Sequence, residues 1–332
     1  MNRTTTFRQL NAIDAIARLG GVSRAAEELH ITQPTVSLQL KLLEEAIGAP
    51  LVQRAGRGTQ LTPAGEVMAG YAGQILRLWR DATEEVAALK GNLAGTLRVG
   101  AITTAEYLLP SMLVAFTADR PEVKIKLHVG NREEIVRMLA MHEIDLAIIG
   151  RPPTDMRTQA TSFAKHPMAF IAAPDHPLMT RRHLTLQDLV EANLLVRERG
   201  SGTRNTVERL FREAGLRLPL GSELSSNAAI KRMVSAGLGV AFLSLHACTL
   251  EFQAGLIGLL PLQGNPIERD WYVLNLPGVR LPRVAVAFRA YLVEQGQAEI
   301  NRQLESFDVI LRRLHARARR LRKAKPDAAE HA

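Results

Sequence analysis

The chain has 332 residues, a formal net charge of +9 and a single cysteine, Cys248. This length suits more than one domain, and a content of 46% hydrophobic and 23% charged residues is typical of globular proteins. One cysteine excludes an intramolecular disulfide and a cysteine-rich metal site, so we expect Cys248 to be a small buried side chain rather than a redox sensor. The apolar runs are too short to cross a bilayer and no secretory signal is present, which predicts a cytoplasmic protein without a membrane partner.

The N-terminal region predicts three short helices. Apolar residues recur at helical spacing between Phe7 and Leu19, and the pattern stops at Gly20-Gly21. Ser23 can cap the second helix and Thr32 the third, where Pro34 would occupy the first turn. The second and third helices, separated by a tight break, have the layout of a helix-turn-helix.

The third helix has two different faces. One face is apolar and is formed by Val36, Leu40, Leu43 and Ile47. The opposite face presents Gln33, Thr35, Ser37, Leu38 and Lys41. Amides and hydroxyls can contact base edges in the major groove, and a cation can contact phosphate, so this face suits DNA recognition. The alternative is an ordinary helical hairpin with a polar outer face.

Two short extended runs follow, at 51–54 and 60–62, and they flank a glycine-containing tip. This pattern predicts a wing that places Arg54 and Arg57 near the DNA backbone or minor groove. Residues 1–65 carry a surplus of only two positive charges, so the prediction depends on residue placement and not on net charge. The predicted DNA-binding residues are Ser23, Arg24, Thr32, Gln33, Pro34, Thr35, Ser37, Leu38, Lys41, Arg54 and Arg57.

About sixty N-terminal residues resemble, without gaps, the signature of LysR-type transcriptional regulators. The resemblance is carried by residues 32–37, Leu43-Glu44, Gly48, Leu51, Arg54 and residues 61–65. It implies a winged helix-turn-helix head, binding to double-stranded DNA and a regulatory function.

Residues 63–90 predict one long helix, in which about 27 residues would span roughly 40 Å. Its apolar positions have coiled-coil-like spacing and are Met68, Tyr71, Ile75, Leu78, Ala82, Val86 and Leu89. We expect a dimerisation linker at residues 64–92, because two-fold DNA sites need two heads. The alternative is a helix packed on its own domain.

From Thr96 onward, short β-branched runs alternate with helical patterns, which predicts α/β structure with mostly parallel sheets. The expected strands are 96–101, 123–129, 144–150, 168–173, 194–197, 239–244 and 271–276. The expected helices between them are 106–118, 133–141, 203–214 and 228–236.

The predicted fold class is α+β multidomain: a winged head, a linker helix and two α/β subdomains of periplasmic-binding-protein type. The expected domains are 1–63 for the head, 64–92 for the linker, 93–300 for effector binding and 301–332 for a basic tail. Subdomain I would comprise about 93–165 and 269–300, and subdomain II about 166–268.

Ligands of open α/β sheets bind beyond the C-terminal ends of strands. The segment 200–203 precedes a helix whose free N–H groups and dipole would favour an anion, and Arg151 and Arg204 could add bidentate contacts. The alternative is a capped helix with surface arginines. The predicted effector-binding residues are Thr103, Thr104, Gly130, Asn131, Arg132, Arg151, Ser201, Gly202, Thr203, Arg204 and Asn227.

A second resemblance covers roughly residues 5–295 and is to the CbbR branch of the family, the regulators of Calvin-cycle and RuBisCO operons. It is carried by residues 129–133, 145–153, 196–204, 226–231 and 271–273. It implies a dimer of dimers that activates a carbon-fixation operon, with RNA polymerase as a further partner. The implied effector is a sugar phosphate, phosphoenolpyruvate or NADPH, and regulation of another metabolic operon remains an alternative.

The enzyme patterns that we sought are missing or incomplete. No nucleophile elbow, zinc-protease helix or phosphate-binding loop occurs, and Phe242 stands where a dinucleotide pattern beginning at Gly237 needs a glycine. We therefore predict no catalytic residues, no metal site and no resident cofactor. Two rival classes are a solute-binding protein and an enzyme with a fused DNA-binding head.

The last segment, residues 301–332, contains nine Arg or Lys residues and four Asp or Glu residues. We expect a helix over residues 298–321 with an apolar side and a basic end. Such an end could be a frayed part of a packed helix or a nonspecific nucleic-acid contact whose strength depends on salt.

Overall fold

The computed structural model describes residues 5–55, 58–88, 93–219 and 221–324. The chain forms two compact units, one of residues 1–95 with the short segment 140–143 and one of the remaining residues from Thr96 onward, and each is described by itself. Arg57, one of the predicted DNA-binding residues, lies outside the described residues, as does the end of the expected linker helix at 89–90.

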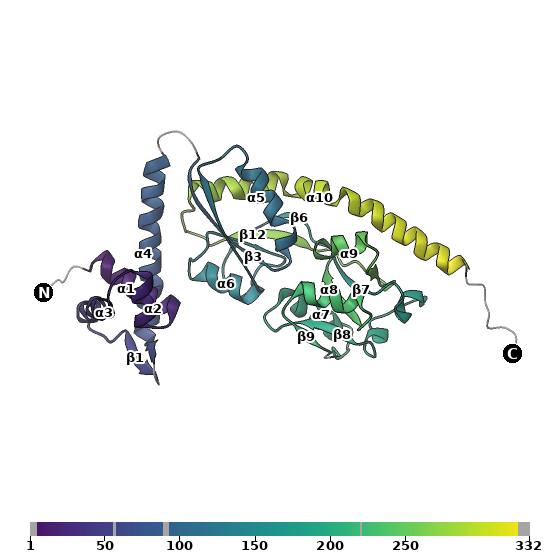
Figure 1. Ribbon diagram of the computed structural model, residues 1–332, viewed down its shortest axis with the longest axis horizontal. Helices are drawn as coiled ribbons and strands as arrows, with labels where there is room; N and C mark the ends of the chain where they lie inside the picture. Colours follow the sequence, from purple (N-terminus) through teal and green to yellow (C-terminus); the bar gives the residue numbers. More distant parts are fainter. Residues whose placement is uncertain (1–4, 56–57, 89–92, 220, 325–332) are drawn as a thin grey trace. The chain divides into compact units, whose positions relative to one another are not determined.

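The first unit begins with three helices, α1 (Phe7–Leu19), α2 (Val22–Glu28) and α3 (Gln33–Ile47) (Figure 1). Thr6 and Gln9 form a reciprocal capping box at the start of α1. The predicted cap of α3 is confirmed, because the Thr32 hydroxyl accepts a hydrogen bond from the Thr35 N–H at 3.4 Å. The predicted cap of α2 is wrong: α2 already begins at Val22, so Ser23 lies inside the helix and makes no cap bond.

The wing is an antiparallel hairpin of β1 (Val52–Ala55) and β2 (Gly58–Leu61), with Val52 opposite Leu61. The Glu44 carboxylate on α3 accepts hydrogen bonds from the N–H groups of Leu51 and Val52, at 2.7 and 3.3 Å. These bonds fix the base of the wing to α3.

Helix α4 (Pro63–Ala88) follows the wing and packs on α1. The core of the unit contains Ile13, Ala25, Val36, Leu43 and Ala72, all fully buried. Ile47, expected on the buried face of α3, is the last residue of that helix and is 47% exposed.

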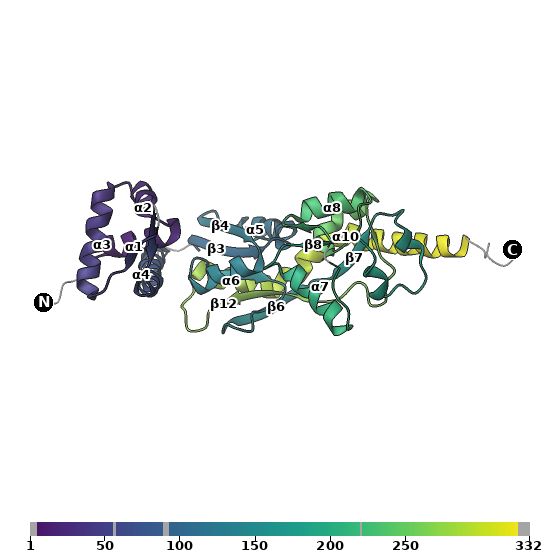
Figure 2. The same ribbon diagram turned by 90° about the horizontal axis from the view of Figure 1, so that it is seen from below.

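The second unit has two lobes, each built on a five-stranded sheet (Figure 2). The first lobe contains, in spatial order, β4 (Val123–Gly130), β3 (Gly95–Ile102), β5 (Leu146–Ile149), β12 (Asp270–Asn275) and β6 (Gln159–Lys165). The second contains β11 (Gly258–Leu259), β7 (Met168–Ala172), β10 (Val240–Ser244), β8 (Leu194–Arg197) and β9 (Glu223–Leu224).

Helices lie between and beside these strands. The α-helices are α5 (Leu109–Thr117), α6 (Arg132–Ala140), α7 (Gly202–Glu213), α8 (Asn227–Ser235), α9 (Thr249–Gln253) and α10 (Arg283–Ala324). The short 3-10 helices are η1 (Ala105–Tyr107), η2 (Pro177–Thr180), η3 (Gln187–Leu189) and η4 (Leu245–Cys248). Cys248 is fully buried, as expected, and burial raises the pKa of its thiol to about 12.

The expectation of mostly parallel sheets is wrong, because both sheets are mixed. Strand β3 is parallel to β5, but β12 is antiparallel to both β5 and β6. In the second lobe β10 is parallel to β8 and antiparallel to β7. The antiparallel strands occur where the chain passes between lobes: the outgoing segment at His166–Met168 runs beside the returning segment at Ile267–Arg269.

Helix α10 contacts α5 and β6 of the first lobe and α9 of the second. It is one continuous helix from Arg283 to Ala324, so the helix expected at 298–321 is not a separate element. No helix in the described part of the chain is both long and apolar enough to cross a membrane.

Candidate DNA-binding surface and effector cavity

The predicted DNA-binding residues that the structure describes are all exposed. Gln33, Ser37 and Lys41 follow one another at spacings of four residues along α3, so their side chains share one face. Leu38 is 53% exposed beside them. Arg54 lies on β1 and is exposed at the wing.

Three residues of this surface, Thr32, Thr35 and Arg24, already make hydrogen bonds within the fold. The hydroxyls of Thr32 and Thr35 lie 2.8 Å apart, in addition to the capping bond that Thr32 makes. Arg24 donates to the carbonyl of Gly20 at 3.5 Å. Gln33, Ser37 and Lys41 therefore form the part of the surface with side chains most open to an external partner.

A cavity of about 220 Å³ lies between the two lobes of the second unit. Residues at the ends of β3 and β5 line it from the first lobe, and the start of α7 lines it from the second. The predicted effector-binding residues that line it are Thr104, Arg132, Arg151, Gly202 and Thr203. Lining residues that the sequence analysis did not select include Thr154, His166, Asn205, Thr206 and Arg269.

The wall of this cavity is cationic. Arg132, Arg151 and Arg269 line it, and no Asp or Glu is among its lining residues. Arg269 donates to the carbonyl of Gly150 at 2.9 Å and to the Thr206 hydroxyl at 2.5 Å. Burial and the nearby cations of Arg209 and Arg151 lower the pKa of Arg269 to about 10, so an anion here would relieve an unfavourable field.

Neutral donors add to the arginines. Ser201 precedes α7 without forming a side-chain cap, which leaves first-turn N–H groups such as those of Gly202 and Thr203 available. Thr104 Oγ1 and His166 Nδ1 are buried without a hydrogen-bond partner among the described residues. Burial, His246 and Arg269 keep the pKa of His166 well below its ordinary value, so its ring is neutral.

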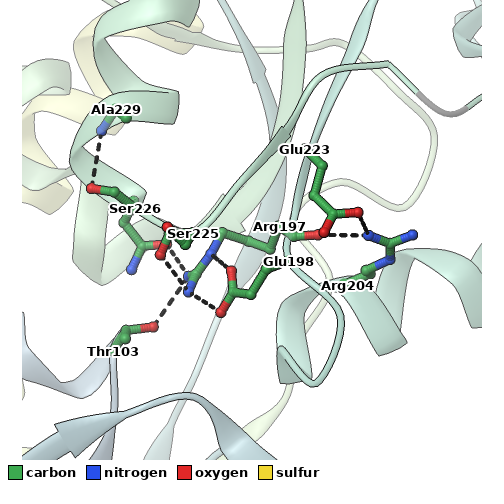
Figure 3. Close-up of polar contacts among 9 residues, drawn as sticks. Thr103, Arg197, Glu198, Arg204, Glu223, Ser225, Ser226 and Ala229 are labelled. Carbon is green, nitrogen blue, oxygen red and sulfur yellow. Dashed lines mark hydrogen bonds and ion pairs between the residues drawn. The ribbon is translucent and has the colours of Figure 1, made fainter.

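Figure 3 shows a polar cluster around Arg197 that the sequence analysis missed. Arg197 is 2% exposed and donates to both carboxylate oxygens of Glu198, at 2.7 and 2.9 Å. It also donates to the Thr103 hydroxyl at 3.1 Å and to the side-chain oxygen of Asn227 at 2.5 Å. Thr103 and Asn227 thus contact Arg197 and are not among the residues that line the cavity.

Arg204 requires a correction. Its guanidinium is 5% exposed and is bonded to Glu208, to Glu223 and to the carbonyl of Arg197. The hydrogen bond to Glu208 is the largest cause that raises the pKa of Arg204, and the hydrogen bond to Glu223 raises it further. Because these contacts use its donors, and because it does not line the cavity, we omit Arg204 from the candidate effector site.

The remaining predicted effector residues have structural contacts. Asn131 accepts a hydrogen bond from the Glu134 N–H and caps α6, while the carbonyl of Gly130 accepts one from the N–H of Thr103. A Cβ at Gly130 would lie 2.3 Å from a Glu134 carboxylate oxygen, so a larger residue here would displace the Glu134 side chain. Ser201 is 4% exposed and precedes α7 without lining the cavity.

Two family models match the chain. Residues 7–66 match the bacterial regulatory helix-turn-helix protein of the LysR family, and residues 90–297 match the LysR substrate binding domain. The chain belongs to the LysR family of transcriptional regulators. Both the resemblance stated from the sequence and the predicted fold class are thereby confirmed, and the family is one of regulators, not enzymes.

The individual relatives of the chain indicate which members of the LysR family it is similar to. The regulator is 44% identical over 286 residues to the HTH-type transcriptional regulator CbbR of Rhodospirillum rubrum, covering 86% of this chain and 95% of that protein. It is 37% identical over 290 residues to a RuBisCO operon transcriptional regulator of Allochromatium vinosum, covering 87% and 96%. The regulator is therefore related to the carbon-fixation regulators of the family.

A solved structure adds a bound ligand to the comparison. The regulatory domain of CcmR from Synechocystis PCC6803, in complex with 2-PG, is 34% identical and has a TM-score of 0.58. The similarity covers 60% of this chain and 96% of that domain. The second unit is thus similar to a regulatory domain that binds a small molecule.

Proposed function

We propose that the regulator binds a small phosphorylated or carboxylated anion in the cavity between its two lobes. The observation that carries the proposal is the concentration of Arg132, Arg151 and Arg269 on a wall without carboxylates. Arginine forms paired hydrogen bonds with phosphate and carboxylate, and the N-terminus of α7 adds N–H donors. The 2-PG complex of the related CcmR domain supports this class of ligand.

The size of the cavity favours some candidates over others. Its volume of about 220 Å³ lies below the roughly 300–1,000 Å³ typical of sites for drug-sized ligands. Phosphoenolpyruvate and other compact phosphorylated acids suit this space. A sugar bisphosphate would require a wider opening between the lobes, and NADPH a much wider one.

The proposed target is a carbon-fixation operon, which the regulator activates when the effector is bound. The relative described as a RuBisCO operon transcriptional regulator supports this target, as does the similarity to CbbR. Control of another metabolic operon is the second candidate, because members of one family often differ in the operon they control.

On the first unit, we assign two roles to the exposed residues. Gln33, Ser37 and Leu38 would contact base edges in the major groove, whereas Lys41, Arg54 and Arg57 would contact phosphates. Amide and hydroxyl side chains match the donor and acceptor pattern of bases, and cations match the uniform backbone. Further contacts to DNA would come from α2 and from the start of α3, through Ser23, Arg24, Thr32, Pro34 and Thr35.

The proposed assembly is a dimer of dimers. Helix α4 leaves an apolar face exposed, formed by Val67, Tyr71, Ile75, Leu78, Trp79 and Val86. Burying this face against a second α4 would remove apolar surface from water and bring two heads to one two-fold DNA site. RNA polymerase would be the further partner of the DNA-bound assembly.

In the proposed mechanism, the effector favours the arrangement in which residues of both lobes contact it at once. Arg132 and Arg151 belong to the first lobe, and Gly202 and Thr203 to the second. The effector can shift the equilibrium between arrangements only by its difference in affinity for them. The favoured arrangement would alter the spacing of the heads on DNA.

Isothermal titration calorimetry of the full chain with phosphoenolpyruvate, ribulose 1,5-bisphosphate and NADPH tests the proposal. We expect saturable binding of at least one phosphorylated acid and loss of about tenfold or more in affinity for Arg151→Ala. Arg212→Ala, at the exposed end of α7, is the matched control and should bind normally. Equal affinities for the two variants would contradict the assignment of the cavity.

A further inference from the structure

A second cavity, of about 260 Å³, lies in the same unit and has no role in the function proposed above. Its lining comes from both lobes and from α10: η1 contributes Tyr107, α8 contributes Lys231, and the segment after β10 contributes His246. Leu108, Leu250 and Ile300 give it largely apolar walls.

His246 supplies this cavity with a polar group that lacks a partner. The Trp271 indole N–H donates to its Nδ1 at 3.1 Å, and burial lowers the pKa of its ring to about 4. A neutral imidazole whose Nδ1 is an acceptor carries its proton on Nε2. The side chain is 6% exposed, lines the cavity, and its Nε2 has no hydrogen-bond partner in the described part of the chain. The Nε2–H donor of His246 is therefore available to a molecule in the cavity.

The charge in this cavity differs from that in the first cavity, which is lined by Arg132, Arg151 and Arg269 and is called the arginine cavity below. The Lys231 ammonium donates to the carbonyl of Ala247 at 2.7 Å, pairs with Glu251 at 2.8 Å and lies over the Tyr107 ring at 4.6 Å. Its charge is thus balanced and its donors are occupied. The lining also includes the neutral side chains of Thr249 and Gln303, whose donor groups bond to other protein atoms. Apolar walls, a balanced ion pair and the neutral N–H of His246 favour an uncharged ligand over an anion.

We propose that this cavity is a second small-molecule site, which takes a compact, uncharged and mostly apolar molecule with one carbonyl oxygen as acceptor. The carbonyl accepts from His246 Nε2–H, and the apolar body packs against Leu108, Leu250 and Ile300. No residue of the arginine cavity is needed for this binding.

The second site is connected to the arginine cavity by stacked rings. Trp271 contacts both histidines: its ring centroid is 3.7 Å from that of His166, with 15° between the planes, and its N–H donates a hydrogen bond to Nδ1 of His246. His166 lines the arginine cavity and His246 lines the second one. A ligand on His246 therefore changes the surroundings of Trp271 and of His166. This coupling, unlike the binding itself, depends on the proposed function of the arginine cavity.

Benzamide and its anionic counterpart benzoate are suitable probes, used with the full chain in calorimetry. We expect one benzamide per chain, with a Kd of about 10 mM or tighter, and at least tenfold weaker binding of benzoate. Leu250 is 72% exposed at the rim, so Leu250→Trp should fill the cavity without disturbing the core and abolish binding. Leu256→Trp, at a site 50% exposed and outside the lining, should bind normally.

Two further variants test the mechanism of binding. His246→Phe keeps a ring but removes the donor, and should weaken benzamide binding at least fivefold. In Trp79→Phe, Trp271 is the only remaining tryptophan, and its fluorescence should change with benzamide along the same binding curve. The proposal is overturned if benzamide shows no saturable binding, if benzoate binds as well as benzamide, or if Leu250→Trp binds like Leu256→Trp.

The coupling has its own test. Saturating benzamide should change the Kd for phosphoenolpyruvate by about fivefold, and phosphoenolpyruvate should change the Kd for benzamide by the same factor. Two unchanged constants would overturn the coupling. Failure of phosphoenolpyruvate and the other anions to bind at all would count against the arginine cavity, and the benzamide results would still decide the second site.

Discussion

Arg197 of the second lobe donates a hydrogen bond to the Thr103 hydroxyl of the first, with 3.1 Å between Nη1 and Oγ1. This bond joins the end of β8 to the segment that follows β3, close to Thr104 in the arginine cavity. It is therefore a direct link between the lobes whose arrangement we expect the effector to change.

Replacing Thr103 with Val removes this link and keeps the shape of the side chain. We expect a loss of about 1–2 kcal/mol in the free energy of unfolding, because hydrogen bonds to charged groups are worth somewhat more than neutral ones. Urea denaturation of the full chain measures the loss. Thr117→Val, which removes a hydroxyl bonded only within α5, should cost less. Equal losses would show that the bond between the lobes adds nothing.

Gly65 of α4 lies against the base of the wing. A Cβ at this position would lie 1.9 Å from the carbonyl oxygen of Leu51, a backbone atom that cannot move aside cheaply. Gly65→Ala should therefore destabilise the first unit by about 3 kcal/mol or more and abolish DNA binding.

Gly70, on the same helix, is the matched control. Nothing lies within 4 Å of a Cβ built there, so Gly70→Ala should be neutral or stabilise by up to about 1 kcal/mol through helix propensity. Thermal melting followed by circular dichroism compares the two variants. Similar melting temperatures would refute the close packing of α4 on the wing.

The two classes of proposed DNA contact should separate in binding measurements. Gln33→Ala should lower discrimination between operator and random DNA by about 1–3 kcal/mol per lost base contact. Lys41→Ala should weaken binding to both DNAs alike and reduce the slope of log K against log salt by about 1. Fluorescence anisotropy at several salt concentrations measures both effects. The assignment fails if the two variants lose discrimination equally.

The buried histidines make the second unit sensitive to acid. Folding lowers the pKa of His246 to about 4, whereas the ordinary value is about 6.5. Between these two values the unfolded state binds more protons than the folded state, so the free energy of unfolding decreases as the pH is lowered. The expected slope is up to about 1.4 kcal/mol per pH unit for each such histidine, and His166 shifts in the same direction.

Urea denaturation between pH 7 and pH 5 measures this slope. His246→Gln cannot titrate in this range, so it should flatten the dependence relative to the unchanged chain. An identical slope in both proteins would show that His246 is not held neutral by the fold.

The sequence predicted the local elements well because their signals are local. The Thr32 cap, the extended runs around Arg54 and the periodicity of α4 each depend on residues a few positions apart. The same reasoning assigned a cap to Ser23, but the N-cap of α2 is Gly21, two residues earlier. A cap can be formed only where the backbone begins the helix, and Ser23 lies past that point.

The cavity could be predicted only in part. Thr104 and Arg151 directly follow strand ends, so the general rule for open sheets selects them. Arg269 and His166 come from the two segments that cross between lobes, and only the antiparallel pairing of those segments brings them to the cavity. The sequence alone does not show a partner for Arg204. In the fold its guanidinium donates a hydrogen bond to Glu223, nineteen residues away.

The most direct measurement is a footprint of the regulator on the DNA upstream of the neighbouring operon, with and without phosphoenolpyruvate, for the unchanged chain and for Arg151→Ala. The account predicts that the effector shifts the footprint of the unchanged chain. It also predicts that the variant protects the same DNA but does not respond. A shift of equal size at equal effector concentration in both proteins would contradict control of DNA binding through the arginine cavity.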